Sequence, residues 1–177
     1  MLNHAFSISA EASPNHGFSE GLSPSIVESM LLVSIVVQIV SGLKLFLRKR
    51  KTARGFFEKL HIRSGLYLAF FFVIHLSAIM VGRYVLNIDT NFYFGVSGLN
   101  TFPFNLFFIP YYACAILAFF GHVAAIHHSK MQQPILGLSP YFQSIAILFV
   151  GVLTTIFIFY GLTDGFVGVE IPSPYQF

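Results

Sequence analysis

Residues 26–51 read IVESMLLVSIVVQIVSGLKLFLRKRK, an apolar run that ends in a dense cluster of basic side chains. About 20 helical residues cross a hydrocarbon core of about 30 Å, and the first part of this stretch, about 26–46, is long enough. Three further apolar runs of similar length follow, at about 57–81, 106–126 and 141–163. Inside a bilayer only helices and closed barrels satisfy the backbone, and these runs lack the alternation of barrel strands. The sequence therefore predicts an all-α integral membrane protein, a bundle of four transmembrane helices.

The composition also indicates a membrane protein. Of the 177 residues, 55% are hydrophobic and only 10% are charged, whereas roughly 25% of the residues of an ordinary soluble domain are charged. No segment outside the four runs is long enough to form a domain, so we expect residues 1–177 to form a single membrane domain. Residues 1–25 are expected to be a polar outer tail. The aromatic-rich connection at about 82–105 is expected to lie as a loop in the membrane interface.

Basic residues are concentrated in two of the connections. Of the ten Lys and Arg residues, all but Arg83 lie in or beside the first connection or in the third: Lys44, Arg48, Lys49, Arg50, Lys51, Arg54, Lys59, Arg63 and Lys130. Six of the seven acidic residues lie on the opposite side. Because Lys and Arg are enriched in cytoplasmic loops, the first and third connections are predicted to face the cytoplasm and both termini the outside. We expect a multi-pass protein of a bacterial inner membrane, or of an organellar inner membrane.

Five of the seven histidines belong to the second and third predicted helices or their inner ends: His61, His75, His122, His127 and His128. An ionisable side chain inside a membrane segment is costly, so each is a functional candidate. His61 and His75 fall within about 40° of one helix face, about 21 Å apart along the axis. His122 stands in a stripe of small residues on the third helix. The adjacent pair at 127 and 128 is interpreted as a solvated helix end.

Two mid-helix imidazoles suit a haem. A neutral imidazole donates a lone pair to the iron while its second nitrogen is held by a nearby acceptor. Cys114 is the only cysteine, which excludes covalent haem attachment through a CxxCH motif and leaves haem b. A histidine in a membrane helix is also often an interhelical hydrogen-bonding residue, and that alternative stays open.

Two motifs carry a resemblance to a known family. On the second helix, Ser64-Gly65 is followed by His75 ten residues after the glycine, and on the third helix His122 follows Phe-Phe-Gly. These motifs resemble the haem-binding helices of the di-haem cytochrome b membrane anchors of succinate:quinone oxidoreductases and fumarate reductases. The resemblance implies that His75 and His122 are axial iron ligands. It further implies that His61, Ser64 and Gly65 lie close to the cofactor.

The resemblance covers roughly residues 57–130 and departs from the family in three respects. An additional helix precedes the motifs, and the arginines of the single-haem relatives do not match exactly at His61-Ile-Arg63-Ser-Gly and Ala125-Ile126-His127-His128. The family's single-chain di-haem anchors have five helices and four ligands, whereas this chain has four helices and one match of each ligand type. Along the helices, His75 and His122 are expected to differ in depth by about 14 Å, too much for one iron. In a two-fold dimer each could pair with its own symmetry mate, the arrangement that we favour. Alternatively, His61 and His122 hold one inner haem, and His75 is a hydrogen-bonding residue or a quinone contact.

Arg83 is the one basic residue predicted on the outer side. Its guanidinium suits a haem propionate or a quinone carbonyl, and equally it could extend to the lipid headgroups.

The sequence thus predicts a haem b membrane subunit for transmembrane electron transfer linked to a quinone. One or two haems per dimer or complex are expected, and no catalytic residue is assigned. The expected partners are the lipid bilayer, a second copy or a related membrane subunit, and soluble flavoprotein or iron–sulfur subunits; no nucleic acid is expected. The alternative is a non-redox four-helix membrane scaffold, an assembly factor or a transport component. A non-haem iron enzyme is a weaker alternative, because such sites need several histidine clusters.

Overall fold

The fold is all-α. The computed structural model describes residues 24–176, so most of the predicted outer tail, 1–25, lies outside the described residues. The elements are α1 (Pro24–Lys49), α2 (Phe56–Tyr84), α3 (Phe92–Asn100), α4 (Asn105–Lys130), α5 (Pro140–Leu162) and the short 3₁₀ helix η1 (Ser173–Tyr175). Four of these helices, α1, α2, α4 and α5, are long and apolar enough to cross a membrane. The predicted four-helix membrane protein is confirmed, and each helix overlaps its predicted span.

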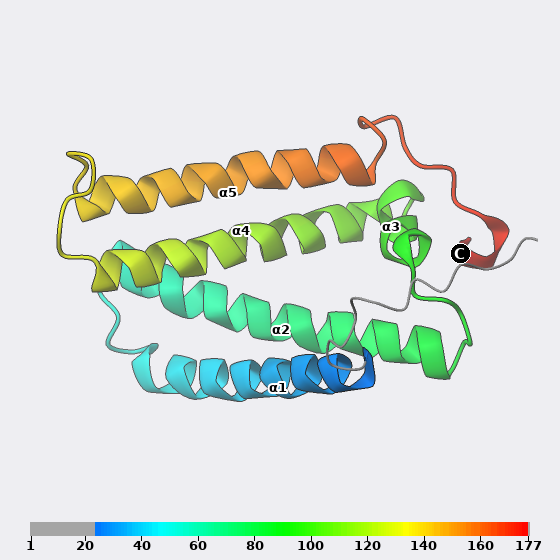
Figure 1. The fold of residues 1–177 in the computed structure, drawn as a ribbon, viewed down its shortest axis with the longest axis horizontal. Coiled ribbons are helices and arrows are strands. Elements are labelled where there is room, and N and C mark those ends of the chain that lie inside the picture. The colour runs from blue at the N-terminus through cyan, green and yellow to red at the C-terminus, as the bar shows by residue number, and fades with distance from the viewer. Residues whose placement is uncertain (1–23, 177) are drawn as a thin grey trace, which may run out of the picture.

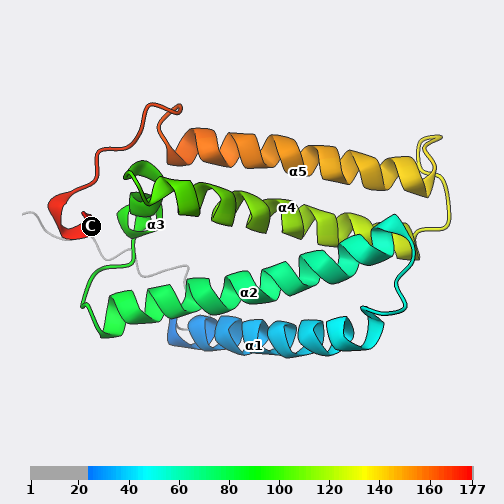
Figure 2. The ribbon, with the colours of Figure 1, turned by 180° about the vertical axis from the view of Figure 1, so that it is seen from behind.

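The four long helices lie side by side in the order α1, α2, α4, α5, as the two opposite views in Figure 1 and Figure 2 show. The packing contacts follow the same order, because α2 packs against both α1 and α4, and α4 packs against α5. Helices α1 and α5 therefore form the two edges of the row. The two inner helices, α2 and α4, are those that carry the five histidines singled out above.

Small residues allow the helices to approach closely, as is usual where lipid supplies no hydrophobic force between them. A Cβ atom added at Gly151 of α5 would lie 2.5 Å from Phe120 Cβ of α4, and one at Gly42 of α1 would lie 3.9 Å from the Gly65 carbonyl oxygen of α2. Ala124 is fully buried between the helices. Large apolar side chains are exposed along the outward faces instead, Phe157 of α5 at 80% for example. Contact with the acyl chains of a bilayer accounts for that exposure.

The connection between α2 and α4 contains a helix that the sequence analysis treated as loop. Asn91 begins α3 by accepting hydrogen bonds from the backbone N–H groups of Tyr93 (2.9 Å) and Phe94 (3.4 Å), a common helix-capping geometry. Asn100 then joins α3 to the end of α5, since its side chain donates to the Leu162 carbonyl (3.0 Å). The aromatic segment is therefore a folded cap over one end of the bundle.

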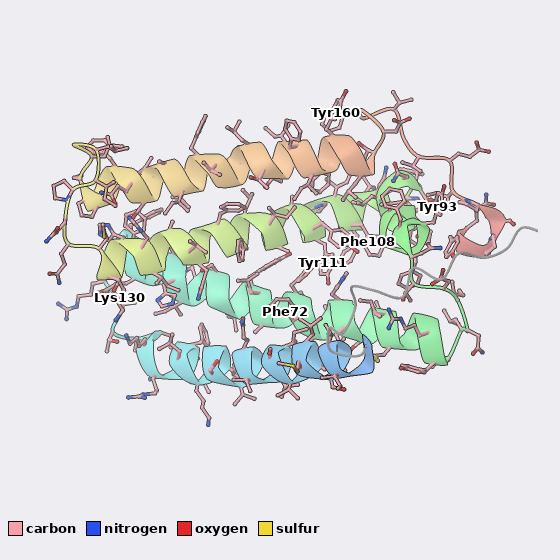
Figure 3. All side chains as sticks on the ribbon, viewed as in Figure 1. Phe72, Tyr93, Phe108, Tyr111, Lys130 and Tyr160 are labelled. Carbon is pink, nitrogen blue, oxygen red and sulfur yellow. The ribbon has the colours of Figure 1, made fainter. Side chains whose placement is uncertain are left out.

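The ends of the helices fall into two groups. The start of α1, the end of α5 and the cap formed by α3 lie at one end of the bundle, and the α1–α2 and α4–α5 connections lie at the other. Figure 3 shows Lys130 at the end opposite to Tyr93 and Tyr160. We call the end that carries Lys130 and the α1–α2 connection the basic end. That the basic end faces the cytoplasm stays a prediction from the charge distribution.

The orientation is testable with single cysteines at exposed positions. In a Cys114→Ser background, we expect Val167→Cys to react with a membrane-impermeant maleimide in intact cells, because it lies at the α3 end. Gln132→Cys, in the α4–α5 connection, should react only after permeabilisation. Gel-shift labelling measures both, and the reverse pattern would contradict the predicted orientation.

The contact between α4 and α5 is testable through two glycines of one helix. Gly151→Ala should destabilise the bundle by about 1–3 kcal/mol, because the new methyl group collides with Phe120 and forces the helices apart. Gly161→Ala is the matched control, since a Cβ atom there meets nothing within 4 Å. It should be neutral or stabilising by about 0.5–1 kcal/mol. Thermal unfolding in detergent compares the two, and equal stability would show that the helices do not touch at Gly151.

Candidate functional site

The structure brings His61 of α2 and His122 of α4 together. Their ring centroids lie 4.5 Å apart, with an angle of 62° between the ring planes. Both side chains are half-buried between the helices. Sequence reasoning placed both residues near the basic end but could not show that the two rings touch, because the rotation of one helix about its axis relative to another depends on packing.

Ser64 contacts one nitrogen of the His122 ring. The Ser64 hydroxyl is buried and donates its one hydrogen to the His61 carbonyl oxygen (3.1 Å), within α2. Its oxygen also lies 3.3 Å from His122 Nδ1. A hydroxyl has one hydrogen but two lone pairs. When that hydrogen is given to the His61 carbonyl, the oxygen can accept from Nδ1–H, and the neutral His122 ring would then keep its lone pair on Nε2.

Gly65 makes room for the His122 ring. A Cβ atom at position 65 would lie 3.2 Å from His122 Cε1 and 3.4 Å from Nδ1, closer than most side chains approach each other. Ser64 and Gly65 thus act on the same imidazole: the first holds its Nδ1 and the second lets the ring lie against the backbone of α2. The predicted role of this pair was to lie close to a cofactor, and the structure places both against a histidine.

A groove of about 550 Å³ opens beside His122, between α1, α2 and α4. Its volume is within the range of sites for cofactors and other small ligands. The groove is mainly apolar, and its lining includes Gly42, Gly65, Ala69, Phe72 and Phe119. The arrangement therefore combines one histidine, oriented through its Nδ1, with an apolar space between helices.

His75 lies in a different place. Its ring stacks on Phe71 of α2, with centroids 5.1 Å apart, and meets Tyr112 of α4 edge-on at 6.0 Å. Tyr112 and His122 are ten residues apart on α4, so the levels of the two histidines differ by about 15 Å along the helix. That offset is close to the 14 Å expected from the sequence. Within one chain, His75 and His122 do not approach a common iron.

An aromatic layer that the sequence analysis did not predict separates the two histidine levels. Tyr67 of α2 donates a hydrogen bond to the Tyr111 carbonyl of α4 (3.0 Å), and Tyr111 donates in turn to the Phe71 carbonyl of α2 (3.2 Å). Figure 3 shows Tyr111 between the two helices. Each hydroxyl is satisfied by a backbone carbonyl of the facing helix, which joins α2 to α4 at this level. In the sequence, the features that could have indicated this layer are the adjacent tyrosines Tyr111 and Tyr112 on one helix and Tyr67 on the other.

The two neighbouring imidazoles do not enclose an iron as they stand. A bond from a metal to an imidazole nitrogen is about 2.0 Å long, so two axial rings on one iron have centroids roughly 6 Å apart. The observed 4.5 Å between His61 and His122 is about 1.5 Å shorter than this distance. A single axial bond from His122 Nε2 requires no such separation. Of the two arrangements left open by the sequence, this geometry favours the one in which the opposite ligand comes from another chain.

His127 and His128 are packed against neighbouring side chains and do not form the solvated helix end that the sequence suggested. Gln143 of α5 is buried, and its amide nitrogen donates to the Leu138 carbonyl (2.7 Å). Its Oε1 therefore accepts from His127 Nε2, at 2.7 Å. His128 stacks on Phe57, with centroids 4.1 Å apart. Both histidines join helices at the basic end.

Arg83 lies at the α3 end and is exposed. Its Nε donates to the Thr90 hydroxyl (2.6 Å), so the guanidinium contacts the connection that leads to α3. The predicted contact with a haem propionate or a quinone carbonyl stays a prediction.

Within residues 24–176, no three His, Cys, Asp or Glu side chains come together as ligands for a metal ion. The described part of the chain therefore holds no multi-histidine cluster of the kind that a non-haem iron enzyme needs. Haem places a smaller demand, because the macrocycle supplies four of the ligands of its iron and the protein needs to add only one or two.

Comparisons of the chain with protein-family models, with curated proteins and with solved structures gave no match. The resemblance of residues 57–130 to cytochrome b anchors accordingly rests on the two motifs quoted above.

The tautomer of His122 is testable by ¹⁵N NMR of histidine-labelled protein. We expect His122 to show the Nδ1–H form, assigned by comparison with His122→Gln. Ser64→Ala should replace that form by a mixture of tautomers, because Nδ1 loses its acceptor. Ser77→Ala is the matched control on the same helix, since its hydroxyl bonds only to the Val73 carbonyl. An unchanged His122 signal in Ser64→Ala would contradict the assignment.

Proposed function

We propose that this chain is a haem b membrane subunit that carries electrons to or from a quinone, with His122 as an axial ligand. The observation that supports this most is the pairing of His122 Nδ1 with the Ser64 hydroxyl, which with Nδ1–H as the donor would leave the Nε2 lone pair for iron. Ligating histidines in proteins nearly always have the second ring nitrogen held in this way. The adjacent apolar groove offers the buried surroundings that a haem b needs. Once bound, the haem would supply one-electron transfer at a potential adjusted by its axial ligands and its burial.

The second axial ligand would come from another chain. The groove beside His122 is bounded by helices α1, α2 and α4, and the His61 ring stands too close to His122 to share an iron with it. In a two-fold dimer with His122 next to the symmetry axis, the two His122 residues would face each other, because residues beside the axis meet their own symmetry mates. His75, half-buried among aromatic rings, would form the second, outer site in the same way. A related membrane subunit carrying its own histidine would serve equally.

Electron transfer to soluble partners would take place at the basic end. Its cationic side chains would attract acidic flavoprotein or iron–sulfur subunits by electrostatic complementarity. His122 lies eight residues before Lys130, the last residue of α4, and hence about 12 Å from this end. A haem there would be close to such a partner.

A non-redox scaffold is the second candidate. The direct contact between His61 and His122 supports it, because two imidazoles at 4.5 Å can serve simply to hold α2 against α4. This candidate requires no cofactor in the groove.

The visible spectrum distinguishes the two candidates. Protein purified after expression with added haem precursor should show a sharp α-band when reduced with dithionite, as a low-spin bis-histidine haem does. His122→Ala should remove the inner haem, and His75→Ala should remove an outer haem if the dimer holds two. Haem content per chain is measured by the pyridine haemochrome assay alongside the spectrum.

His127→Gln is the control for the haem experiment. It changes a histidine on the same helix that bonds to Gln143, and it should keep the full α-band. Size-exclusion chromatography of each variant establishes that loss of haem is not loss of fold. A colourless wild-type protein, or full haem in both His75→Ala and His122→Ala, would rule out the proposed ligands and leave the scaffold.

A further inference from the structure

A second cavity, of about 540 Å³, lies at the basic end, away from the groove beside His122. It is formed by the end of α1, the α1–α2 connection, the first turns of α2 and the end of α4. Its polar lining includes Lys49, Thr52, Glu58, His61 and Ser129. Neither the haem proposal nor the packing of the helices uses this space.

Most of the positive charge around this cavity has no ion-pair partner within the described part of the chain. Eight of the ten Lys and Arg residues lie between positions 44 and 63, and among residues 24–176 none of these eight forms an ion pair with a carboxylate. Glu58 is the one acidic residue in this region of the sequence. Its carboxylate accepts hydrogen bonds from the backbone N–H groups of Arg54 (2.9 Å) and Gly55 (3.4 Å). It is thus engaged mainly with the backbone, and it also interacts electrostatically with Lys49.

The start of α2 adds backbone donors to the same space. Gly55 precedes the helix and offers no side chain to cap it. The first turn of a helix has N–H groups without intrahelical partners and carries the positive end of the helix dipole. Phe56 and Phe57, in that first turn, line the cavity. An anion in the cavity would therefore meet a cationic side chain, hydroxyl groups and helical N–H groups together.

The surroundings of the cavity indicate which anion it would take. It opens at the ends of helices that are long and apolar enough to span a membrane, and the apolar side chains of its lining include Phe56, which is 65% exposed, and Ala53. A phosphate group in the cavity could keep its acyl chains against these side chains. Basic pockets between membrane helices on the cytoplasmic side are known to bind phospholipid headgroups of negative charge.

We propose that this cavity binds the phosphate headgroup of an anionic phospholipid, with Lys49 as its principal cation. The cavity is thus a lipid site that holds the α1–α2 connection against the end of α4. This lipid site does not depend on the proposed haem. We favour a lipid over a free phosphate ion because of the exposed apolar side chains beside the cavity.

The proposal is tested by measuring which lipids the protein retains in detergent. In detergent there is no charged bilayer that would attract the basic end of the protein in general. Protein purified in a neutral detergent is titrated with phosphatidylglycerol or phosphatidylcholine, and bound lipid is counted by native mass spectrometry. We expect one phosphatidylglycerol to be retained per chain in preference to phosphatidylcholine. Lys49→Gln should weaken retention about fivefold, the change that corresponds to about 1 kcal/mol for one basic residue.

Two further variants make the result specific. Lys51→Gln removes the same charge two residues away, outside the lining of the cavity, and should change retention less than twofold. Ala53→Phe fills the cavity without changing charge and should also release the lipid, so the proposal does not depend on one variant. Equal loss in Lys49→Gln and Lys51→Gln, or equal retention of the two lipids, would overturn it. Displacement of the lipid by inorganic phosphate at matched concentration would assign the cavity to a soluble anion and overturn it as well.

Discussion

The pairing of α2 with α4 is the interaction on which the rest of the structure depends. In a bilayer no water is present to satisfy a buried hydroxyl or imidazole, so each polar group on these helices needs a partner inside the protein. Tyr67 and Tyr111 bond to backbone carbonyls across the interface in both directions, and Ser64 bonds to His122 nearer the basic end. These three contacts fix the position of α2 along the axis of α4. That position decides which histidines of the two helices lie next to each other.

The row of helices extends from this pair. Helix α1 adds to α2 through the close approach of Gly42 to the Gly65 carbonyl, and α5 adds to α4 through Gly151 and Phe120. One consequence is that the groove beside His122 has a wall from α1 on one side and from α4 on the other. The edge helix α1 therefore contributes to the site although it carries no histidine. The proposed haem site and the proposed lipid site both lie toward the basic end, in separate spaces.

Much of the fold was predictable from local sequence. Four apolar runs of membrane-spanning length predict four helices because a backbone inside lipid has almost no alternative to the helix. The nine-residue helix α3 was missed, since a segment so short is stabilised by its tertiary contacts more than by its own propensity. Gly98 of α3 lies against the Phe108 ring of α4. The hydrogen bonds of Asn100 with Leu162 and Val169 join residues far apart in the chain. No local pattern reveals such contacts.

The sequence by itself determined that this is a four-helix membrane protein, which helices carry the histidines, and that His75 stands about 14 Å from His122 along the bundle, since these depend only on hydropathy and helical rise. Only the tertiary structure decided that His61 touches His122, that Ser64 orients it, and that His75 faces Tyr112. The reason is physical. Helical rise is a property of one chain segment, whereas the rotation and stagger of two helices are set by how their side chains pack, and this depends on every residue along the contact.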